Sequence, residues 1–376
     1  MDTELDAINA AADLVAQAEQ ALRYVPLITP LDADRVRREF LAGWAAGRPV
    51  NPRLAYPAAD PAPAAAAIAA ARNRLPHDPF WHDLLARELD HAESALRALT
   101  TRDPAEMTGY AMRVFGAPTP TAVAEARRYL AEHPADEHPP AADWTADRAA
   151  DAMRTVLAEA GLAQWSVEQS EHLAERMSVV AAESTVRVKR GAVFTAAEVR
   201  RLIVHEIGTH VLRAANGRHQ ALRILGHGLS DSAPAEEGLA VWHEHRAGVA
   251  DVDAMRRNAL RVLACQAALG GDFRTVFAQL VPHTSPDEAF SLTLRVKRGP
   301  ADTAAPGGYL KEHVYFMEFL TVGAHLAAHP GHHDLLMAGR WSLSGLDALL
   351  RWQDGGLLAE PAYRLERVVE LAGAVV

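Results

Sequence analysis

The segment 195–217 constrains the fold more than any other part of the chain, because both ends of its helix can be predicted from the residues. It opens with Thr195-Ala-Ala-Glu198, a capping box in which the threonine and glutamate side chains satisfy backbone amides at a helix start. It closes with Asn216-Gly217, which is typical of a helix C-terminus. We therefore expect one long helix over these residues.

This helix carries His205-Glu-Ile-Gly-Thr-His210, which has one residue more than the familiar zinc peptidase pattern His-Glu-x-x-His. On a regular α-helix the familiar spacing places the histidines about 40° apart around the axis, whereas this spacing places them about 140° apart. A π-turn, with an i to i+5 hydrogen bond, would return His210 to the face of His205. We therefore expect a π-bulge between the two histidines, where Gly208 supplies flexibility.

A catalytic zinc needs three protein ligands and one open position for water, so a third ligand must come from elsewhere. The segment Glu236-Glu237-Gly238-Leu239-Ala240 supplies it at the first turn of another helix. Either glutamate could bind the metal, and Gly238 would permit close helix approach. Glu206 would not bind zinc but would accept the proton of the bound water. The alternative without a metal site treats Glu206 as a surface carboxylate and the histidines as solvated side chains.

No metal role is predicted for the remaining histidines. Four of them cluster around Pro330-Gly331, as expected for a helix end at which the helix dipole favours positive charge: His325, His329, His332 and His333. His243 and His245 are expected to be solvated or to lie outside the ligand set. The single cysteine, Cys265, lies in an apolar helical stretch and is expected in the core.

The spacing of apolar residues in the N-terminal third predicts several helices, with a proline-bearing break at 51–63. They are expected over residues 3–22, 64–75, 80–99 and 121–132. The proline-rich stretch 132–140 is the best linker candidate, because proline removes backbone donors and disfavours helix. These features predict a helical N-terminal subdomain at 1–140 and a catalytic domain at 141–376.

Short strands are expected just before the histidine-bearing helix, at 165–168, 177–181 and 185–188. In the last strand Val186 and Val188 would face one side, and Arg187 and Lys189 the other. Strands are a minority, so the expected fold class is α+β, mostly α.

Charge and hydropathy exclude several classes of protein. The net charge is −10, so no basic excess exists to displace counterions from nucleic-acid phosphates. The first six residues are acidic where a secretory signal would be basic, and no apolar run approaches the roughly 20 residues that span a bilayer. We expect a soluble cytoplasmic protein without a nucleic-acid or membrane partner. The oligomeric state stays open.

Several segments together resemble the tyrosine carboxypeptidase family of zinc metallopeptidases, whose bacterial members are named for a Gln-Glu-Gly-Leu-Ala motif. The similar segments are His205–His210, Leu212-Arg213, Asn216-Gly217, Glu236–Ala240, Arg295–Gly299 and Gly308–Tyr315. The resemblance covers residues 180–325 well and the N-terminal part loosely. Two departures bear on substrate preference: Glu236 stands in place of glutamine, and Lys311-Glu312 in place of Lys-Asp.

The resemblance implies zinc bound by His205, His210 and Glu237, with Glu206 as general base and Glu236 outside the ligand set. It also implies a gluzincin-like catalytic domain with a short β-meander and a helical N-terminal subdomain. The implied activity is removal of a C-terminal aromatic residue from a peptide or protein substrate.

An exopeptidase acting at a C-terminus must recognise a free carboxylate beside the metal, which calls for fixed cationic donors. The segments 187–191 and 295–299, both Arg-Val-Lys-Arg-Gly, could each supply such donors. Arg298 and Lys311 are the first choices for this clamp, and a solvated basic face is the alternative. Tyr315 is the expected donor to the oxyanion, although core packing explains it equally well. Tyr309 is the reserve.

Two other functions remain open. One is an endopeptidase, including a maturation protease for a ribosomally made peptide. The other is a non-catalytic zinc-binding regulatory protein, which the intact Glu206 disfavours because such a protein has no need of a carboxylate beside its ligand.

Overall fold

The computed structural model describes residues 2–135, 142–171, 173 and 175–376. The backbone divides into two compact units, each built from two segments of the chain. The first comprises Met1–Ala135 with Met255–Met317, and the second Asp136–Ala254 with Glu318–Val376. The predicted domain boundary between residues 140 and 141 lies outside the described residues and stays a prediction.

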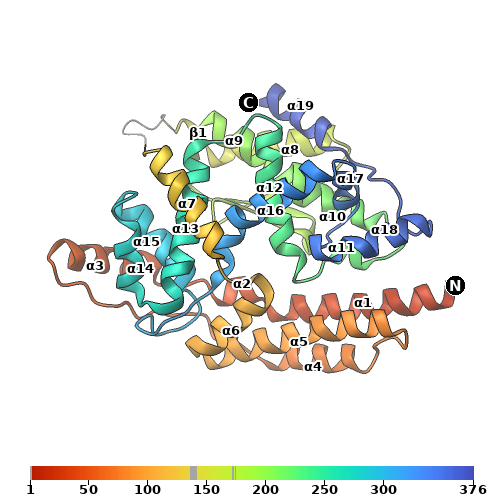
Figure 1. Ribbon diagram of the computed structural model, residues 1–376, viewed down its shortest axis with the longest axis horizontal. Helices are drawn as coiled ribbons and strands as arrows, with labels where there is room; N and C mark the ends of the chain where they lie inside the picture. Colours follow the sequence, from red (N-terminus) through yellow and green to blue (C-terminus); the bar gives the residue numbers. More distant parts are fainter. Residues whose placement is uncertain (1, 136–141, 172, 174) are drawn as a thin grey trace. The chain divides into compact units, whose positions relative to one another are not determined.

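The first unit is helical. Its N-terminal segment contains α1 Asp2–Leu22, α2 Tyr24–Leu27, α3 Ala33–Ala45, α4 Ala62–Arg72, α5 Pro79–Thr101, α6 Pro104–Phe115 and α7 Pro120–Glu132. Its later segment contains most of α13 Val252–Gly270, then α14 Phe273–Leu280, α15 Pro286–Lys297, the 3-10 turn η3 Leu310–His313 and the start of α16 Val314–Ala328. Helices α1, α4 and α5 run side by side (Figure 1). The helices expected in the N-terminal third are confirmed.

Aromatic packing forms part of the core of this unit. The Phe40 ring lies 4.9 Å from that of Phe273 and 5.0 Å from that of Phe277, in edge-to-face arrangements that aromatic pairs prefer. Cys265 is fully buried in α13, as predicted.

The second unit opens with β1 Trp144–Thr145, α8 Ala146–Glu159 and a small sheet. The sheet contains β2 Ser166–Ser170, β3 Met177–Val180 and β4 Thr185–Lys189. A second pair, β1 with β5 Val193–Phe194, is antiparallel and was not predicted. The three expected strands are confirmed, and Val186 and Val188 are buried while Arg187 and Lys189 are partly exposed.

The prediction of a β-meander is wrong. The strand order is β2-β4-β3, with β2 parallel to β4 and β3 antiparallel to it. The physical reason is that β4 is the most buried of the three strands and takes the centre, where both of its edges are hydrogen-bonded. The chain segment between β2 and β4, which includes β3, is long enough for the crossover that parallel strands require.

The helix after Thr195 is continuous in three parts: α9 Ala196–Leu202, the π-helix η2 Ile203–Val211 and α10 Leu212–Arg218. The capping box of Thr195 and Glu198 is formed. The π-bulge prediction is confirmed, and the π segment extends over nine residues. The predicted stop at Asn216-Gly217 falls just short of the helix end, because Gly217 serves close packing instead: a Cβ there would meet the Leu225 carbonyl oxygen at 2.0 Å.

The rest of the second unit is helical. It contains α11 Ile224–His227, α12 Ser232–Arg246, the end of α16, α17 His332–Met337, the 3-10 turn η4 Leu343–Gly345, α18 Leu346–Asp354 and α19 Leu365–Val375. The π-helix packs against α12 and α19. The predicted fold class, α+β and mostly α, is confirmed. Among the described residues, no helix is both long and apolar enough to cross a bilayer.

Buried polar side chains of α10 fix the end of α17 and the segment after it. The Nε atom of Arg213, a fully buried residue, donates to the carbonyl oxygens of Leu336 and Gly339, and one of its terminal nitrogens donates to that of Trp341. The Asn216 amide nitrogen donates to the carbonyl of Met337. Burying these three nitrogens is tolerable because each donates to a backbone carbonyl.

Candidate active site

The π-helix brings His205 and His210 to one side of the helix. An i to i+5 hydrogen bond places residues five apart about one turn apart, so the two rings face the same space. Their centroids lie 5.2 Å apart. Without the π segment the same two side chains would diverge.

Glu237 of α12 completes the group. Its Oε2 lies 3.6 Å from Nε2 of His205 and 3.5 Å from Nε2 of His210. One ligand atom from each of the three residues lies within 4.8 Å of the others. The geometry therefore places Glu237, rather than Glu236, in the candidate metal-binding group with the two histidines, as the family resemblance implies.

Gly238 allows α12 to approach α16 closely. A Cβ at this position would lie 2.5 Å from the backbone carbon of Glu318 and 2.6 Å from its carbonyl oxygen, closer than atoms tolerate. The predicted close helix approach is confirmed. Since Gly238 follows Glu237 directly, this contact also fixes the position of the ligand carboxylate.

His205 is oriented by a buried carboxylate. Its Nδ1 donates to Oε1 of Glu244 at 2.7 Å, and the same oxygen accepts a hydrogen bond from Arg201 at 2.9 Å. Burial alone raises the pKa of Glu244, but Arg201 and His205 lower it below its ordinary value. With its Nδ1 proton held by Glu244, His205 directs Nε2 toward the site.

His210 has the equivalent arrangement on its other side. Its Nδ1 lies 3.3 Å from Oε1 of Glu236, whose second oxygen accepts from Nε of Arg340 at 3.3 Å. Burial alone raises the pKa of Glu236, but Arg340 and His210 lower it. The Nδ1 atom of each imidazole therefore faces a carboxylate, that of Glu244 or Glu236. Each of these two carboxylates is in turn paired with an arginine.

The residues fit a bound cation. Burial alone lowers the pKa of His205, but hydrogen bonds to Glu237 and Glu244 raise it to about 9. Burial likewise opposes protonation of His210, whose pKa is raised to about 10 by Glu236 and Glu237. The site thus stabilises positive charge at the point where the three ligand atoms meet. Two imidazoles and one carboxylate suit a divalent transition metal ion.

Glu206 lies beside the ligands without belonging to them. It is 6% exposed, and burial raises its pKa above the ordinary value while His205 and His210 oppose the shift. A buried carboxylate of raised pKa is suited to accept and return a proton.

Behind the π-helix, a line of hydrogen bonds runs to the surface of the second unit. Thr209 Oγ1 lies 2.7 Å from Nδ1 of His243, whose Nε2 lies 3.0 Å from Nε2 of His333. His243 is fully buried and so is not solvated, whereas His245 is exposed and stacks on Phe319 at 4.6 Å. Neither belongs to the ligand group.

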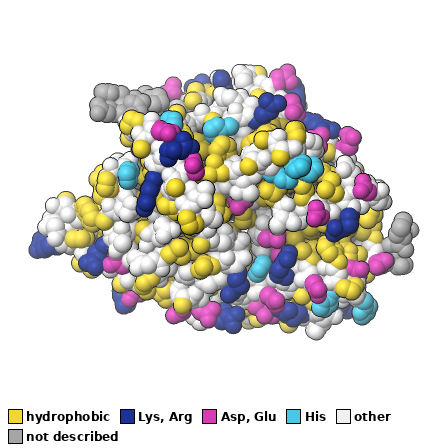
Figure 2. All heavy atoms as spheres, in the orientation of Figure 1, with side chains coloured by type: hydrophobic (Ala, Val, Ile, Leu, Met, Phe, Trp, Pro, Cys, Tyr) yellow, Lys and Arg dark blue, Asp and Glu magenta, His cyan; other side chains and the backbone are white. Residues whose placement is uncertain are grey.

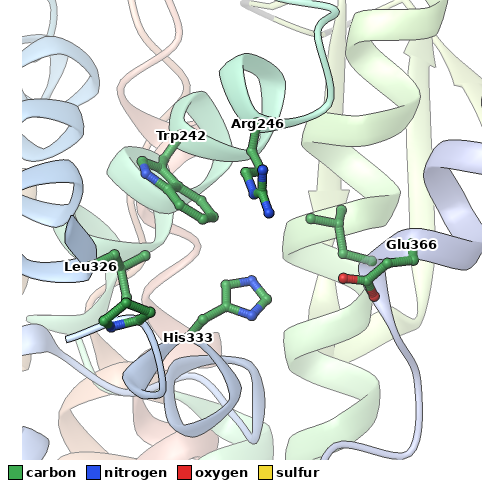
Figure 3. A pocket seen from close by; sticks show the side chains of 7 residues that line it. Trp242, Arg246, Leu326, His333 and Glu366 are labelled. Atoms are coloured by element: carbon green, nitrogen blue, oxygen red, sulfur yellow. The ribbon is translucent and has the colours of Figure 1, made fainter.

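His333 also lines a pocket of about 340 Å³ between α12, α17 and α19. Figure 3 shows Trp242, Arg246, His333 and Glu366 directed toward the same space. Trp242 and His333 pack together with ring centroids 5.6 Å apart. The residues that line the pocket do not include His205, His210 or Glu237, and His333 is linked to the π-helix through His243 and Thr209.

The predicted substrate-binding residues belong to the first unit, where three arginines surround one carboxylate. Glu312 is hydrogen-bonded by Arg295 at 2.8 and 2.9 Å, and it lies 3.3 Å from Arg261 and 3.6 Å from Arg298. Burial alone raises the pKa of Glu312, but Arg295, Arg261 and Arg298 lower it to about 2. The cluster keeps an excess of positive charge.

Both predicted tyrosines lie against this cluster. The guanidinium of Arg261 stands 4.3 Å from the centroid of the Tyr315 ring, and Nζ of Lys311 stands 5.8 Å from it. The guanidinium of Arg298 stands 5.1 Å from the ring centroid of Tyr309. Both tyrosines are buried, so packing is part of the role of each.

Sequence reasoning missed the outer partners Glu244, Arg201 and Arg340. Two of them could have been found from their spacing in the sequence. Arg201 precedes His205 by four residues and Glu244 follows Glu237 by seven, and on a helix both spacings place the two side chains on the same face. Arg340 carries none, because it comes from a distant loop and reaches Glu236 only in the folded chain.

Comparison with known proteins agrees with this geometry. A family model described as microtubule-associated tyrosine carboxypeptidase matches residues 38–375, so the match includes most of the N-terminal third that the motifs covered only loosely. Microtubule-associated tyrosine carboxypeptidase 1 of Mus musculus is 32% identical over 129 residues, 33% of this chain and 27% of the mouse protein. The Homo sapiens protein of the same name is 34% identical over 119 residues, 30% of this chain and 25% of the human protein. The aligned segment thus spans about a quarter of each relative.

Proposed function

Because the chain belongs to the microtubule-associated tyrosine carboxypeptidase family, we propose that it is a zinc-dependent carboxypeptidase that removes a C-terminal tyrosine or phenylalanine from a peptide or protein. The observation that carries the proposal is the buried group of His205, His210 and Glu237, with Glu206 beside it. A cytoplasmic location remains a prediction.

Zinc is the proposed metal because two imidazoles and a carboxylate with one open position are a common catalytic zinc set. When bound, the ion would polarise the scissile carbonyl and lower the pKa of a water molecule. Glu244 and Glu236 would accept the Nδ1 protons of the two imidazoles and so hold each ring with Nε2 turned toward the ion.

Glu206 is the proposed general base. Its carboxylate would accept the proton of the attacking water and later donate it to the leaving amine. Burial raises the pKa of Glu206, which makes the second of these transfers easier near neutral pH than for an ordinary glutamate.

Arg298 and Lys311 are the proposed clamp for the C-terminal carboxylate, and Tyr315 the proposed donor to the oxyanion. The excess of arginine over carboxylate around Glu312 supports this assignment, because a buried cluster of net positive charge favours a bound anion. The Nε atom of Arg298 is buried and has no hydrogen-bond partner among the described residues. An anion would satisfy such a donor.

The test compares three peptides: one ending in free tyrosine, its C-terminal amide, and one with tyrosine only at an internal position. Zinc-loaded protein should release tyrosine from the first peptide alone, as detected by mass spectrometry. Arg298→Ala and Lys311→Ala should lower kcat/KM by about 30-fold or more, since a desolvated charge pair is worth 2 kcal/mol or more. Arg53→Ala, which changes an arginine with 84% of its side chain exposed, is the matched control and should be neutral.

Each other outcome has a distinct meaning. Equal cleavage of the amide, or cuts only at internal bonds, would contradict the carboxypeptidase assignment and favour a maturation endopeptidase. Zinc binding without cleavage of any peptide in a C-terminal library would favour a regulatory zinc protein. Unchanged kinetics in both clamp variants would remove Arg298 and Lys311 from the proposed site while leaving the metal centre untouched.

A further inference from the structure

Three histidines meet on the surface of the second unit, away from the metal group described above. His325 lies near the end of α16, His329 follows one turn later, and His332 is the first residue of α17. Figure 2 shows histidine side chains gathered over α17 and the end of α16. His329 is exposed, and the other two are partly exposed. All three rings are therefore accessible from solvent.

The rings are mutually close. Centroid distances are 5.1 Å between His325 and His329, 5.2 Å between His325 and His332, and 4.9 Å between His329 and His332. Nε2 of His325 lies 3.0 Å from Nδ1 of His332. Two nitrogens bound to one tetrahedral zinc ion at about 2.0 to 2.1 Å lie roughly 3.3 Å apart, so this pair is almost in place.

The backbone holds the three residues in this arrangement. The amide of His329 donates to the carbonyl of His325, and the amide of His332 donates to the carbonyl of His329. His325 and His329 are thus separated by four residues on a helical turn, a spacing that lets two imidazoles share one ion. The turn at Pro330-Gly331 returns His332 to the same point.

We propose that His325, His329 and His332 form a second metal site, which takes a divalent transition metal ion such as zinc and links the end of α16 to the start of α17. Three imidazoles are ligands that zinc, copper and nickel share. His329 stacks on His332 with 12° between the ring planes, so its exposed side chain must turn before its nitrogen faces the ion. A solvent molecule would complete the tetrahedron.

The site is independent of the proposed peptidase activity. It uses no carboxylate and shares no residue with His205, His210 and Glu237. The neighbouring His333 is engaged with His243 and is not part of it. Metal at this site would constrain the turn that leads into α17.

The experiment titrates zinc into the full-length protein against a competing chelator, with elemental analysis of stoichiometry. Wild-type protein should bind two zinc ions per chain, the second more weakly than the first. His325→Ala, His329→Ala and His332→Ala should each keep the first ion and weaken the second at least about ten-fold, the lower end of what even outer-shell changes cost. Zinc added beyond one equivalent should also raise the melting temperature of the wild type but not of these variants.

His283→Ala, a change at an exposed histidine of the first unit, is the matched control and should bind both ions as the wild type does. A wild type in which every bound zinc ion is unaffected by all three changes would overturn the proposal. So would a second ion that persists with unchanged affinity in all three variants, because it would then be held elsewhere. Loss of the first ion in a variant that retains the second would also contradict it.

Discussion

His205 donates through Nδ1 to Oε1 of Glu244 at 2.7 Å, and Glu244 is held in turn by Arg201. This pair fixes the direction of the ring, because the carboxylate holds the Nδ1 proton and Nε2 is turned toward Glu237. Glu236 does the same for His210. We expect Glu244→Gln to weaken zinc affinity about 10- to 100-fold, the usual effect of changing such a partner. Chelator competition measures this.

The matched control for that variant is Glu370→Gln, which changes an exposed glutamate of α19 with an arginine three residues away. Its zinc affinity should equal that of the wild type. Full zinc affinity in Glu244→Gln would show that the hydrogen bond to His205 does not support the metal centre.

The ligand set predicts zinc content directly. Protein purified without added metal, or reloaded by titration, should retain one tightly bound zinc ion per chain. His210→Ala should lose it, because two remaining ligands do not hold a catalytic zinc tightly. Elemental analysis decides the question, and unchanged zinc content in His210→Ala would refute the three-ligand set.

Glu206→Gln separates catalysis from metal binding. The amide keeps the size of the side chain but cannot accept a proton, so kcat should fall by about 10²- to 10⁴-fold while zinc content stays at one per chain. Steady-state kinetics and elemental analysis on the same sample test this. Wild-type turnover in Glu206→Gln would rule out Glu206 as the general base.

Gly238→Ala tests the contact between α12 and α16. The new Cβ would meet the Glu318 backbone at 2.5 Å, so α12 must shift, at a cost of about 1 to 3 kcal/mol in the free energy of unfolding. The adjacent Glu237 would shift with it and weaken zinc binding. Gly373→Ala in α19, where no atom lies within 4 Å, should stabilise the protein by about 0.5 to 1 kcal/mol. Equal denaturation midpoints for the two variants would contradict the close approach.

The lowered pKa of Glu312 leads us to expect that the stability of the fold depends on pH. Its pKa in the folded state, about 2, is lower than the ordinary value of 4.5, so the carboxylate stabilises the fold above about pH 4.5 and this contribution is lost as the pH falls toward 2. Glu312→Gln should therefore cost on the order of 3 kcal/mol at pH 7 and progressively less below pH 4.5.

Urea unfolding of wild type and Glu312→Gln at several pH values measures that difference. Glu288→Gln, at a partly exposed ion pair with Arg257, should cost less than about 1 kcal/mol at any pH. If the difference in free energy of unfolding between wild type and Glu312→Gln is the same at pH 7 and pH 3, the three arginines do not stabilise the charged form of Glu312.

The sequence by itself determined the local structure around the candidate metal group and pointed to its residues. The capping box at Thr195 fixed a helix start, and the spacing of His205 and His210 required a π segment because a regular helix would separate the rings. The need for a third ligand pointed to the segment beginning at Glu236. The first two inferences depend on residues close together in the chain, where helical geometry alone sets the direction of side chains, and the third depends on the number of ligands that a catalytic zinc needs.

Only the tertiary structure paired His205 with Glu244 and Glu236 with Arg340, and placed β2 parallel to β4. It also brought Glu237 to the two histidines, a choice that the residue pattern left open and that the family resemblance implied. These relationships join segments that are distant in the chain, and a local pattern carries no information about which distant groups will meet. Glu236 and Glu237 are neighbours of the same type, so only the approach of α12 to the π-helix distinguishes them. The buried carboxylates of Glu244 and Glu236 are each paired with an arginine, because an unpaired charge in the interior would lower the stability of the fold.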